Sequence, residues 1–150
     1  MHPRLARALV NLSEVERGGT VLDPFCGTGG ILLEAGLIGC DVYGSDIQAE
    51  MVEGAAENLE TYGVDADIRE AAFSDVDAEF DQQFDAVVTD LPYGKASKTE
   101  DDPTDAFVEQ APDLADRVVS VSDQAEIGDL EPSFELYVHR SMTRYVYVVD

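Results

Sequence analysis

The sequence is poor in basic residues and cysteine, and it has no long apolar run. No stretch of 18 or more apolar residues occurs, so no membrane-spanning helix is expected. The segment Met1 to Leu5 lacks the basic-then-apolar order of a signal peptide. Cys26 and Cys40 are the two cysteines, and we expect free thiols in a reducing cytoplasm. No cluster of histidine, cysteine and acidic residues has metal-ligand spacing, so no metal is expected.

The shortage of basic residues leaves a large negative charge. Nine lysines and arginines stand against 32 aspartates and glutamates, a formal net charge of −23. Taken alone, this charge argues against nucleic-acid binding, which depends on neutralising phosphates. The apolar segments are too regular for a disordered acidic chain, while a binder of basic partners stays open. We favour an acidic surface adapted to high salt, because molar salt shortens the Debye length to about 3 Å.

The few basic residues are unevenly distributed. Six of the nine form three short clusters: Arg4 with Arg7, Lys95 with Lys98, and Arg140 with Arg144. Chance explains this about as well as contact with an anionic substrate does.

Apolar periodicity and turn residues divide the chain into alternating strands and helices. We expect helices over 3–12, 30–38, 48–62 and, weakened by Pro112, 105–114. We expect strands over 20–22, 41–46, 66–70, 84–89 and 118–121, and a hairpin over 134–139 and 144–149. Residues 71–83, with at most one helical turn, and 96–104 are expected as loops. This order predicts one α/β domain over residues 1–150, a doubly wound, mostly parallel sheet with an antiparallel C-terminal hairpin.

A glycine-rich turn follows the first expected strand. Gly27-Thr28-Gly29-Gly30 permits positive φ angles and a close approach of the backbone to a ligand. Asp46 ends the next strand, where a carboxylate can accept both hydroxyls of an adenosine ribose. The turn matches neither the dinucleotide fingerprint nor a phosphate loop, so a nucleoside without phosphates fits better. An acid-rich pocket suits a cationic cofactor, which favours S-adenosylmethionine.

A second turn, Asp90-Leu91-Pro92-Tyr93, follows the strand expected over 84–89. Asp90 and the Leu91 carbonyl can accept hydrogen bonds from an exocyclic amine, since Pro92 constrains the backbone there. Tyr93 offers an aromatic face for a planar base, worth about 1–3 kcal/mol. Positioning and desolvation would then supply most of the rate.

These two turns together resemble those of the class I S-adenosylmethionine-dependent amino-methyltransferases. The chain is similar, more narrowly, to the archaeal tRNA (guanine-10, N2) methyltransferases, on the further stretches 3–12, Gly94-Lys95 and 138–144. The resemblance implies a Rossmann-like fold, S-adenosylmethionine as methyl donor, and transfer to guanosine N2 in tRNA. It also implies a small zinc-binding activator protein as a partner.

The predicted site residues form three sets. The catalytic set is Asp90, Leu91, Pro92 and Tyr93. The cofactor-binding set is Asp23, Pro24, Phe25, Cys26, Gly27, Thr28, Gly29, Asp46 and Ile47. The substrate-binding set is Lys95, Arg140 and Arg144, which we expect near RNA phosphates.

The chain departs from the family pattern in three places. Leu91 replaces the first proline of the usual Asp-Pro-Pro-Tyr turn but keeps the backbone carbonyl. Glu70-Ala71-Ala72 stands where the family has an Asp-Ala pair near the adenine amine. The family's N-terminal THUMP domain, which binds RNA, is absent, so we expect the chain alone to bind intact tRNA poorly.

Two other readings stay open. The same turns could methylate adenine N6 in DNA or a protein glutamine amide. Alternatively, the chain is a truncated, catalytically silent domain that binds the cofactor or a protein partner.

Overall fold

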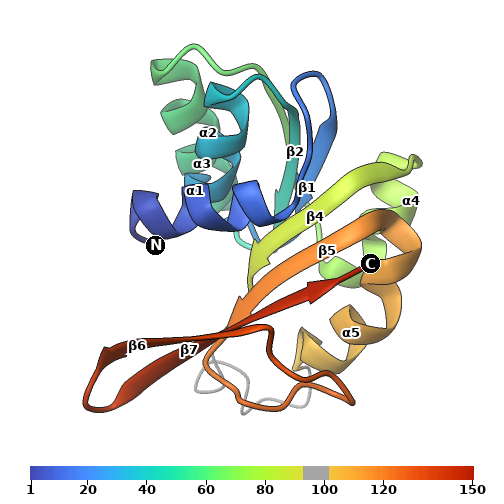
Figure 1. Cartoon of the computed structure of the whole chain (residues 1–150). Helices are drawn as coiled ribbons and strands as arrows, with labels where there is room; N and C mark the ends of the chain where they lie inside the picture. Colours follow the sequence, from blue (N-terminus) through green and yellow to red (C-terminus); the bar gives the residue numbers. More distant parts are fainter. Residues whose placement is uncertain (93–101) are drawn as a thin grey trace.

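A seven-stranded sheet forms the centre of the computed structural model, which describes residues 1–92 and 102–150 (Figure 1). The strands are β1 (Thr20–Asp23), β2 (Asp41–Asp46), β3 (Ala66–Glu70), β4 (Phe84–Asp90), β5 (Ala115–Ser122), β6 (Phe134–His139) and β7 (Met142–Val149). The helices are α1 (Pro3–Leu12), α2 (Gly30–Leu37), α3 (Ala49–Thr61), the short 3₁₀ helix η1 (Phe73–Asp75), α4 (Val76–Phe80) and α5 (Pro103–Leu114).

The strand order is β3-β2-β1-β4-β5-β7-β6. Strands β1 to β5 run parallel, β7 runs antiparallel to β5, and β6 completes an antiparallel hairpin with β7. The predicted doubly wound sheet with an antiparallel C-terminal hairpin is therefore confirmed. The order reverses between β1 and β4, and such a switch point opens a crevice at the carboxyl ends of the strands.

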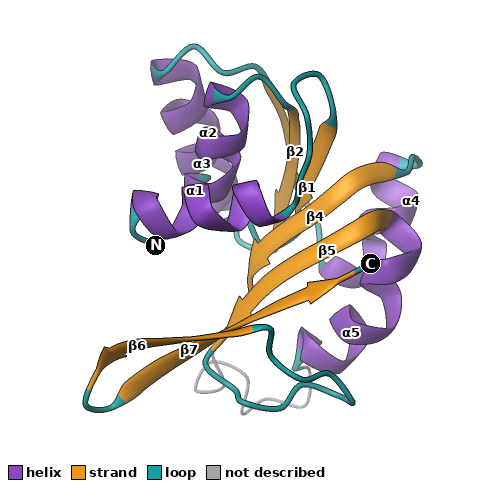
Figure 2. Ribbon diagram, viewed as in Figure 1, coloured by secondary structure: helices purple, strands orange, loops and turns teal. Residues whose placement is uncertain are grey.

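Helices cover both faces of the sheet (Figure 2). Helices α1, α2 and α3 pack on one face, where the core includes Leu9, Val10, Val21, Leu32, Leu59, Val88, Val119 and Val121. Helices α4 and α5, with η1, pack on the other face, where the core includes Leu22, Phe73, Val87, Phe107, Leu114 and Tyr147. Strands β1, β4 and β5 are thus buried on both sides, which explains the apolar run at the centre of each strand.

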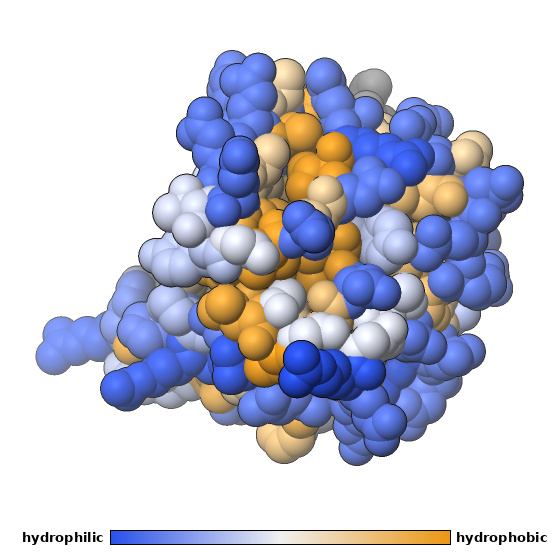
Figure 3. All heavy atoms as spheres, turned by 90° about the horizontal axis from the view of Figure 1, so that it is seen from above, coloured by the Kyte–Doolittle hydropathy of each residue, from blue (hydrophilic) through white to orange (hydrophobic). Residues whose placement is uncertain are grey.

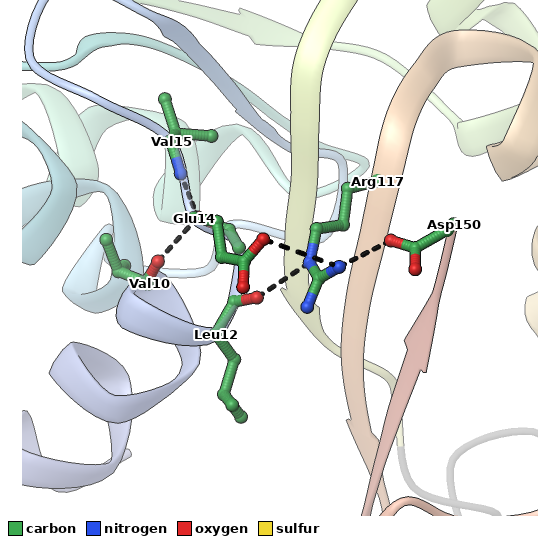
Figure 4. Close-up of polar contacts among 7 residues, drawn as sticks. Val10, Leu12, Glu14, Val15, Arg117 and Asp150 are labelled. Carbon is green, nitrogen blue, oxygen red and sulfur yellow. Dashed lines mark hydrogen bonds and ion pairs between the residues drawn. The ribbon is translucent and has the colours of Figure 1, made fainter.

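Arg117 of β5 links the end of helix α1 to the sheet (Figure 4). Its Nε donates to the Leu12 carbonyl at 2.8 Å, at the end of α1. Its Nη1 forms ion pairs with Asp150 and, at 3.8 Å, with Glu14. One guanidinium therefore joins the first helix, the loop after it and the last residue of the chain.

Two expectations about loops and helices were wrong. Residues 71–83 are not mainly loop, because η1 and α4 occupy 73–80. Phe73, Val76 and Phe80 are buried there, and their burial offsets the polarity of the intervening residues. The helix expected over 105–114 is confirmed and continues through Pro112, but it starts at Pro103, inside the segment expected as loop. Pro112 lies in the last turn of the helix, which the burial of Leu114 stabilises. At the other end, the Asp102 side chain caps the first turn.

Strand β5 is longer than expected, covering 115–122 rather than 118–121. It pairs with β4 from Ala115 onward and with β7 from Val118 onward, so the β4 ladder holds its first residues in the sheet. The β6–β7 hairpin is confirmed, although β7 begins at Met142 rather than Arg144. The hairpin extends beyond the helices at the lower left of Figure 1.

Both cysteines are free and buried, as expected for free thiols. Within residues 1–92 and 102–150, no helix combines the length and apolar character that crossing a bilayer requires.

Gly44 of β2 allows α2 to pack closely on the sheet. A Cβ atom at this position would lie 2.5 Å from Leu32 Cδ1, 3.1 Å from Ile68 Cδ1 and 3.2 Å from Cys26 Cβ. Cys26 belongs to the glycine-rich turn, so this contact also sets where the turn lies against β2.

We expect Gly44→Ala to destabilise the fold by about 1–3 kcal/mol, because overpacking forces neighbouring atoms to move. Gly54→Ala is the matched control. Its added Cβ would meet Thr28 Cγ2 at an ordinary 3.5 Å, and alanine favours the interior of α3. Urea unfolding followed by circular dichroism measures both changes. A Gly44→Ala midpoint at or above that of the wild type would contradict the prediction.

Candidate functional site

Three carboxylates meet at the carboxyl edge of the sheet. Asp23, Asp46 and Asp90 are the last residues of β1, β2 and β4, which are neighbours in the sheet. The charges of Asp90 and Asp46 both raise the pKa of Asp23, so each of these two carboxylates lies within electrostatic reach of Asp23. The structure thus brings the two predicted turns together at the β1–β4 switch point, where parallel sheets bind ligands.

The glycine-rich turn between β1 and α2 has the conformation that its glycines permit. Gly27 and Gly29 have φ angles of 52° and 88°. A Cβ added to Gly29 would lie 3.3 Å from Ala55 Cβ, so this glycine lets α3 approach the turn. A Cβ added to Gly27 would meet nothing within 4 Å. The backbone at Gly27 therefore borders open space into which a ligand can settle.

Asp46 ties the turn to β2. Its Oδ2 accepts from the Gly27 N–H at 3.0 Å, and its Oδ1 accepts from the Gln48 N–H at 2.9 Å. A carboxylate has about four acceptor positions, so both oxygens retain capacity for further donors. The next residue, Ile47, is 70% exposed and presents an apolar side chain at this edge.

Asp23 lies beneath the turn and is 2% exposed. It accepts from Thr89 Oγ1 at 2.5 Å and from the Phe25 N–H at 3.1 Å. Burial raises its pKa to about 7, although these two hydrogen bonds act in the opposite direction. Asp23 therefore joins β1, β4 and the turn, and it changes charge near neutral pH.

The other predicted cofactor residues contribute mainly packing or backbone. Pro24 is buried, and the Phe25 ring stacks on Phe73 with centroids 5.4 Å apart. The Cys26 thiol is buried, and burial raises its pKa, so the sulfur is a poor nucleophile. The exposed Thr28 accepts a hydrogen bond through its carbonyl from Asn58 Nδ2 at 3.0 Å.

The second turn begins at the end of β4. The Leu91 N–H donates to the Val121 carbonyl at 2.9 Å, which extends the β4–β5 ladder by one residue. Leu91 is buried, and Pro92 is half-buried. Asp90 is partly exposed and forms an ion pair with Arg144 of β7. Tyr93 and Lys95, also predicted for the site, lie outside the described residues.

The structure separates the two predicted RNA-contacting arginines. Arg140 lies exposed in the hairpin turn, whereas Arg144 is 7% exposed and paired with Asp90. Arg144 is therefore not an exposed charge of the hairpin.

Sequence reasoning missed three polar residues that support the site. Thr89 bonds to Asp23, Asn58 bonds to the Thr28 carbonyl, and the Gln48 N–H bonds to Asp46. Thr89 had a detectable signal, since it is a hydroxyl residue inside an otherwise apolar strand. In residues 1–92 and 102–150, no three His, Cys, Asp or Glu side chains are grouped as a metal site requires.

The pKa of Asp23 predicts a pH-dependent stability. Because its pKa is raised to about 7 from 3.8, the folded protein binds this proton more tightly than the unfolded chain does. Asp23 therefore destabilises the fold progressively as pH rises from about 4 to about 7. We expect Asp23→Asn, which keeps the Oδ1 acceptor, to flatten this fall. Urea midpoints of both proteins between pH 5 and 8 measure the difference, and parallel curves would contradict the assignment.

Comparison with known proteins places this site in a family. Residues 1–145 match the methyltransferase domain described as UPF0020, RMKL-like. The chain is 39% identical to the tRNA (guanine(10)-N2)-dimethyltransferase of Methanothermobacter thermautotrophicus, covering 100% of this chain and 49% of that protein. It is 36% identical to a probable tRNA (guanine(10)-N2)-dimethyltransferase of Methanothermococcus thermolithotrophicus, covering 97% of this chain and 96% of that protein.

A solved structure supports the fold. The RNA methyltransferase of Salinibacter ruber, in complex with S-adenosyl-L-homocysteine, superposes with a TM-score of 0.74 at 17% identity. The match covers 99% of this chain and 92% of that one. The chain spans about half the length of the Methanothermobacter relative. The paired strand-end turns, the sheet topology and the match over residues 1–145 agree, and the chain belongs to the UPF0020 family of RMKL-like methyltransferase domains.

Proposed function

We propose that this chain is a methyltransferase domain that moves a methyl group from S-adenosylmethionine to the exocyclic N2 amine of a guanosine in tRNA. The observation that carries the proposal is the meeting of two strand-end turns at the β1–β4 switch point. One turn offers a glycine backbone and the acid Asp46, and the other offers Asp90 before Leu91-Pro92. A donor and an amine held by these turns would lie side by side.

The residues of the first turn fit this cofactor. The open space at Gly27 accommodates a ligand that a side chain would exclude, and the Asp46 carboxylate retains acceptor positions for two ribose hydroxyls. The exposed Ile47 offers an apolar contact for adenine. When bound, S-adenosylmethionine supplies an electrophilic methyl group on a sulfonium. Asp23 and Asp46 provide negative charge that favours such a cation.

The second turn fits an amine. The Asp90 carboxylate accepts a hydrogen bond from the amine and stabilises positive charge that develops on nitrogen during transfer. Pro92 holds the backbone so that the Leu91 carbonyl can serve as a second acceptor. Tyr93 completes this catalytic set as the face on which the base stacks.

The choice of guanosine N2 is supported by the relatives. Two of the proteins similar to this chain are described as tRNA (guanine(10)-N2)-dimethyltransferases. Contact with tRNA phosphates falls to Lys95 and to the exposed Arg140. A small zinc-binding activator, a cytoplasmic location and a single domain over residues 1–150 remain predictions. Co-purification from the native host, with zinc analysis of the captured protein, tests the activator.

Adaptation to high salt is a further part of the proposal. Hydrophilic residues cover most of the face in Figure 3, around a central apolar area. Helix α3 contains no basic residue and carries exposed glutamates at positions 50, 53, 57 and 60. These positions are three or four residues apart, so the charges share one face, and each like-charged pair costs roughly 0.2–0.5 kcal/mol. Salt screens this repulsion.

We expect Asp90→Asn to lower the methylation rate of unmodified tRNA by about 100-fold or more, because a neutral amide cannot stabilise charge on the amine. Its affinity for S-adenosylmethionine should stay within about twofold in calorimetry. Asp46→Ala is the matched control and should lose cofactor affinity instead. Undiminished N2-methylguanosine formation by Asp90→Asn would overturn the proposed role.

The same assay separates the alternatives. Mass spectrometry of the product distinguishes N2-methylguanosine from N6-methyladenine in DNA and from methylglutamine in protein. Cofactor binding without turnover on any of these substrates would support a catalytically silent domain instead.

Salt dependence gives a separate test. We expect the urea midpoint to rise as KCl increases from about 0.1 to 2 M, since repulsion among the α3 glutamates is screened. Glu53→Gln/Glu57→Gln should be more stable than wild type at low salt and should gain less from added KCl. Equal gains in both proteins would show that this face does not set the salt response.

A further inference from the structure

The ion pair between Asp90 and Arg144 joins the proposed catalytic turn to the C-terminal hairpin. Register partners connect Asp90 of β4 to Val121 of β5, and Val121 to Val146 of β7. Arg144 lies two residues before Val146, so its side chain leaves the sheet on the same face. The side chain is only 8% exposed, and that of Asp90 is 26% exposed. The guanidinium thus reaches Asp90 across the end of β5.

This pairing opposes the effect of burial. Burial raises the pKa of Asp90, whereas the charge and hydrogen bond of Arg144 lower it. Among the described residues, the other charges that act on or near Asp90 include Asp123 after β5, Asp23 at the end of β1, and the amino group of Met1. The two acids disfavour a charged Asp90 and the amino group favours it. Among these groups, Arg144 makes the direct contact.

An arginine is suited to this position. Its Nη2 contacts Asp90 Oδ1, which limits the rotation of the carboxylate while leaving other lone pairs free for a second donor. Contact with RNA phosphates requires an accessible cation, and the Arg144 side chain is largely buried. Arg144 is therefore poorly placed for such contact. The pair therefore leaves Asp90 both oriented and able to accept from an incoming amine.

We propose that Arg144 is a positioning residue of methyl transfer, which fixes the orientation and the charge of the Asp90 carboxylate that receives the amine. The inference rests on the proposed function for its catalytic consequence. The electrostatic part stands on the Asp90–Arg144 contact alone, and it is measurable without cofactor or RNA.

The first test is a carboxyl-carbon NMR titration of Asp90 in the cofactor-free protein. The pKa of Asp90 should be higher in Arg144→Gln than in wild type, because a cation has been removed. Arg69→Gln is the matched control, since Arg69 of β3, at the opposite edge of the sheet, pairs with Asp67 of β3 and Glu79 of α4. It should leave the titration unchanged. An unshifted Asp90 in Arg144→Gln would overturn the proposal even if the chain proves not to be a methyltransferase.

The second test is the pH profile of kcat/KM with S-adenosylmethionine and unmodified tRNA. The acid limb should move to higher pH in Arg144→Gln, with kcat at neutral pH about 10-fold or more below wild type and cofactor affinity within twofold. Arg144→Lys keeps the charge but not the fork, so its acid limb should move little while kcat falls several-fold. A pH profile of Arg144→Gln identical to that of the wild type would contradict the proposed role of Arg144 in catalysis.

Arg144→Lys also decides the case if Arg144→Gln does not fold. Wild-type kcat in the folded lysine variant would show that fork geometry is not needed and would overturn the positioning role. A several-fold loss of kcat, with melting temperature and cofactor affinity intact, would support it. If the wild-type protein does not methylate tRNA, the proposed function fails, and the NMR titration alone then tests the ion pair.

Discussion

The site depends on three carboxylates at the carboxyl edge of a largely buried sheet. Each carboxylate has a different set of hydrogen-bond and ion-pair partners. Asp46 accepts hydrogen bonds from two backbone N–H groups. Asp23, whose pKa is raised to about 7, accepts from a hydroxyl and one N–H. Asp90 forms an ion pair with a guanidinium. Since burial of an unpaired charge is costly, these partners permit the cluster to exist. They also leave the acids different free capacity: Asp23 is almost fully buried, whereas Asp46 and Asp90 are partly exposed and could accept further donors.

The partners come from parts of the chain that the sheet order brings together. Thr89 reaches Asp23 because β1 and β4 are neighbours, although 66 residues separate them. Arg144 reaches Asp90 because β7 inserts between β5 and β6. The C-terminal hairpin is therefore more than an edge of the sheet. Within residues 1–92 and 102–150, it supplies the arginine that forms an ion pair with the proposed catalytic acid.

Local sequence was sufficient to predict the elements and the two turns, but not these partners. The strands β1 and β4 are apolar runs that end in an acid, and parallel strands place such ends at one edge, so Asp23 and Asp90 could be brought together by reasoning alone. The Asp90–Arg144 pair required the register of β7 on β5, which no local pattern encodes. The helices in 73–80 were missed, and α5 was expected to be weakened at Pro112, for a related reason. Tertiary burial of Leu114, Phe73 and Phe80 outweighs unfavourable local composition.

The arginines of this acidic chain also acquire a different meaning. Their clustering in the sequence suggested contact with an anionic substrate, yet Arg7 pairs with Glu34, Arg69 with Asp67, Arg117 with Asp150, and Arg144 with Asp90. In the part of the chain that the structure describes, the cations left without an ion pair are Arg4, Arg17 and Arg140. Affinity for RNA grows with the number of phosphates neutralised. Most arginines here join elements of the fold, so strong RNA binding would need basic surface beyond these three residues.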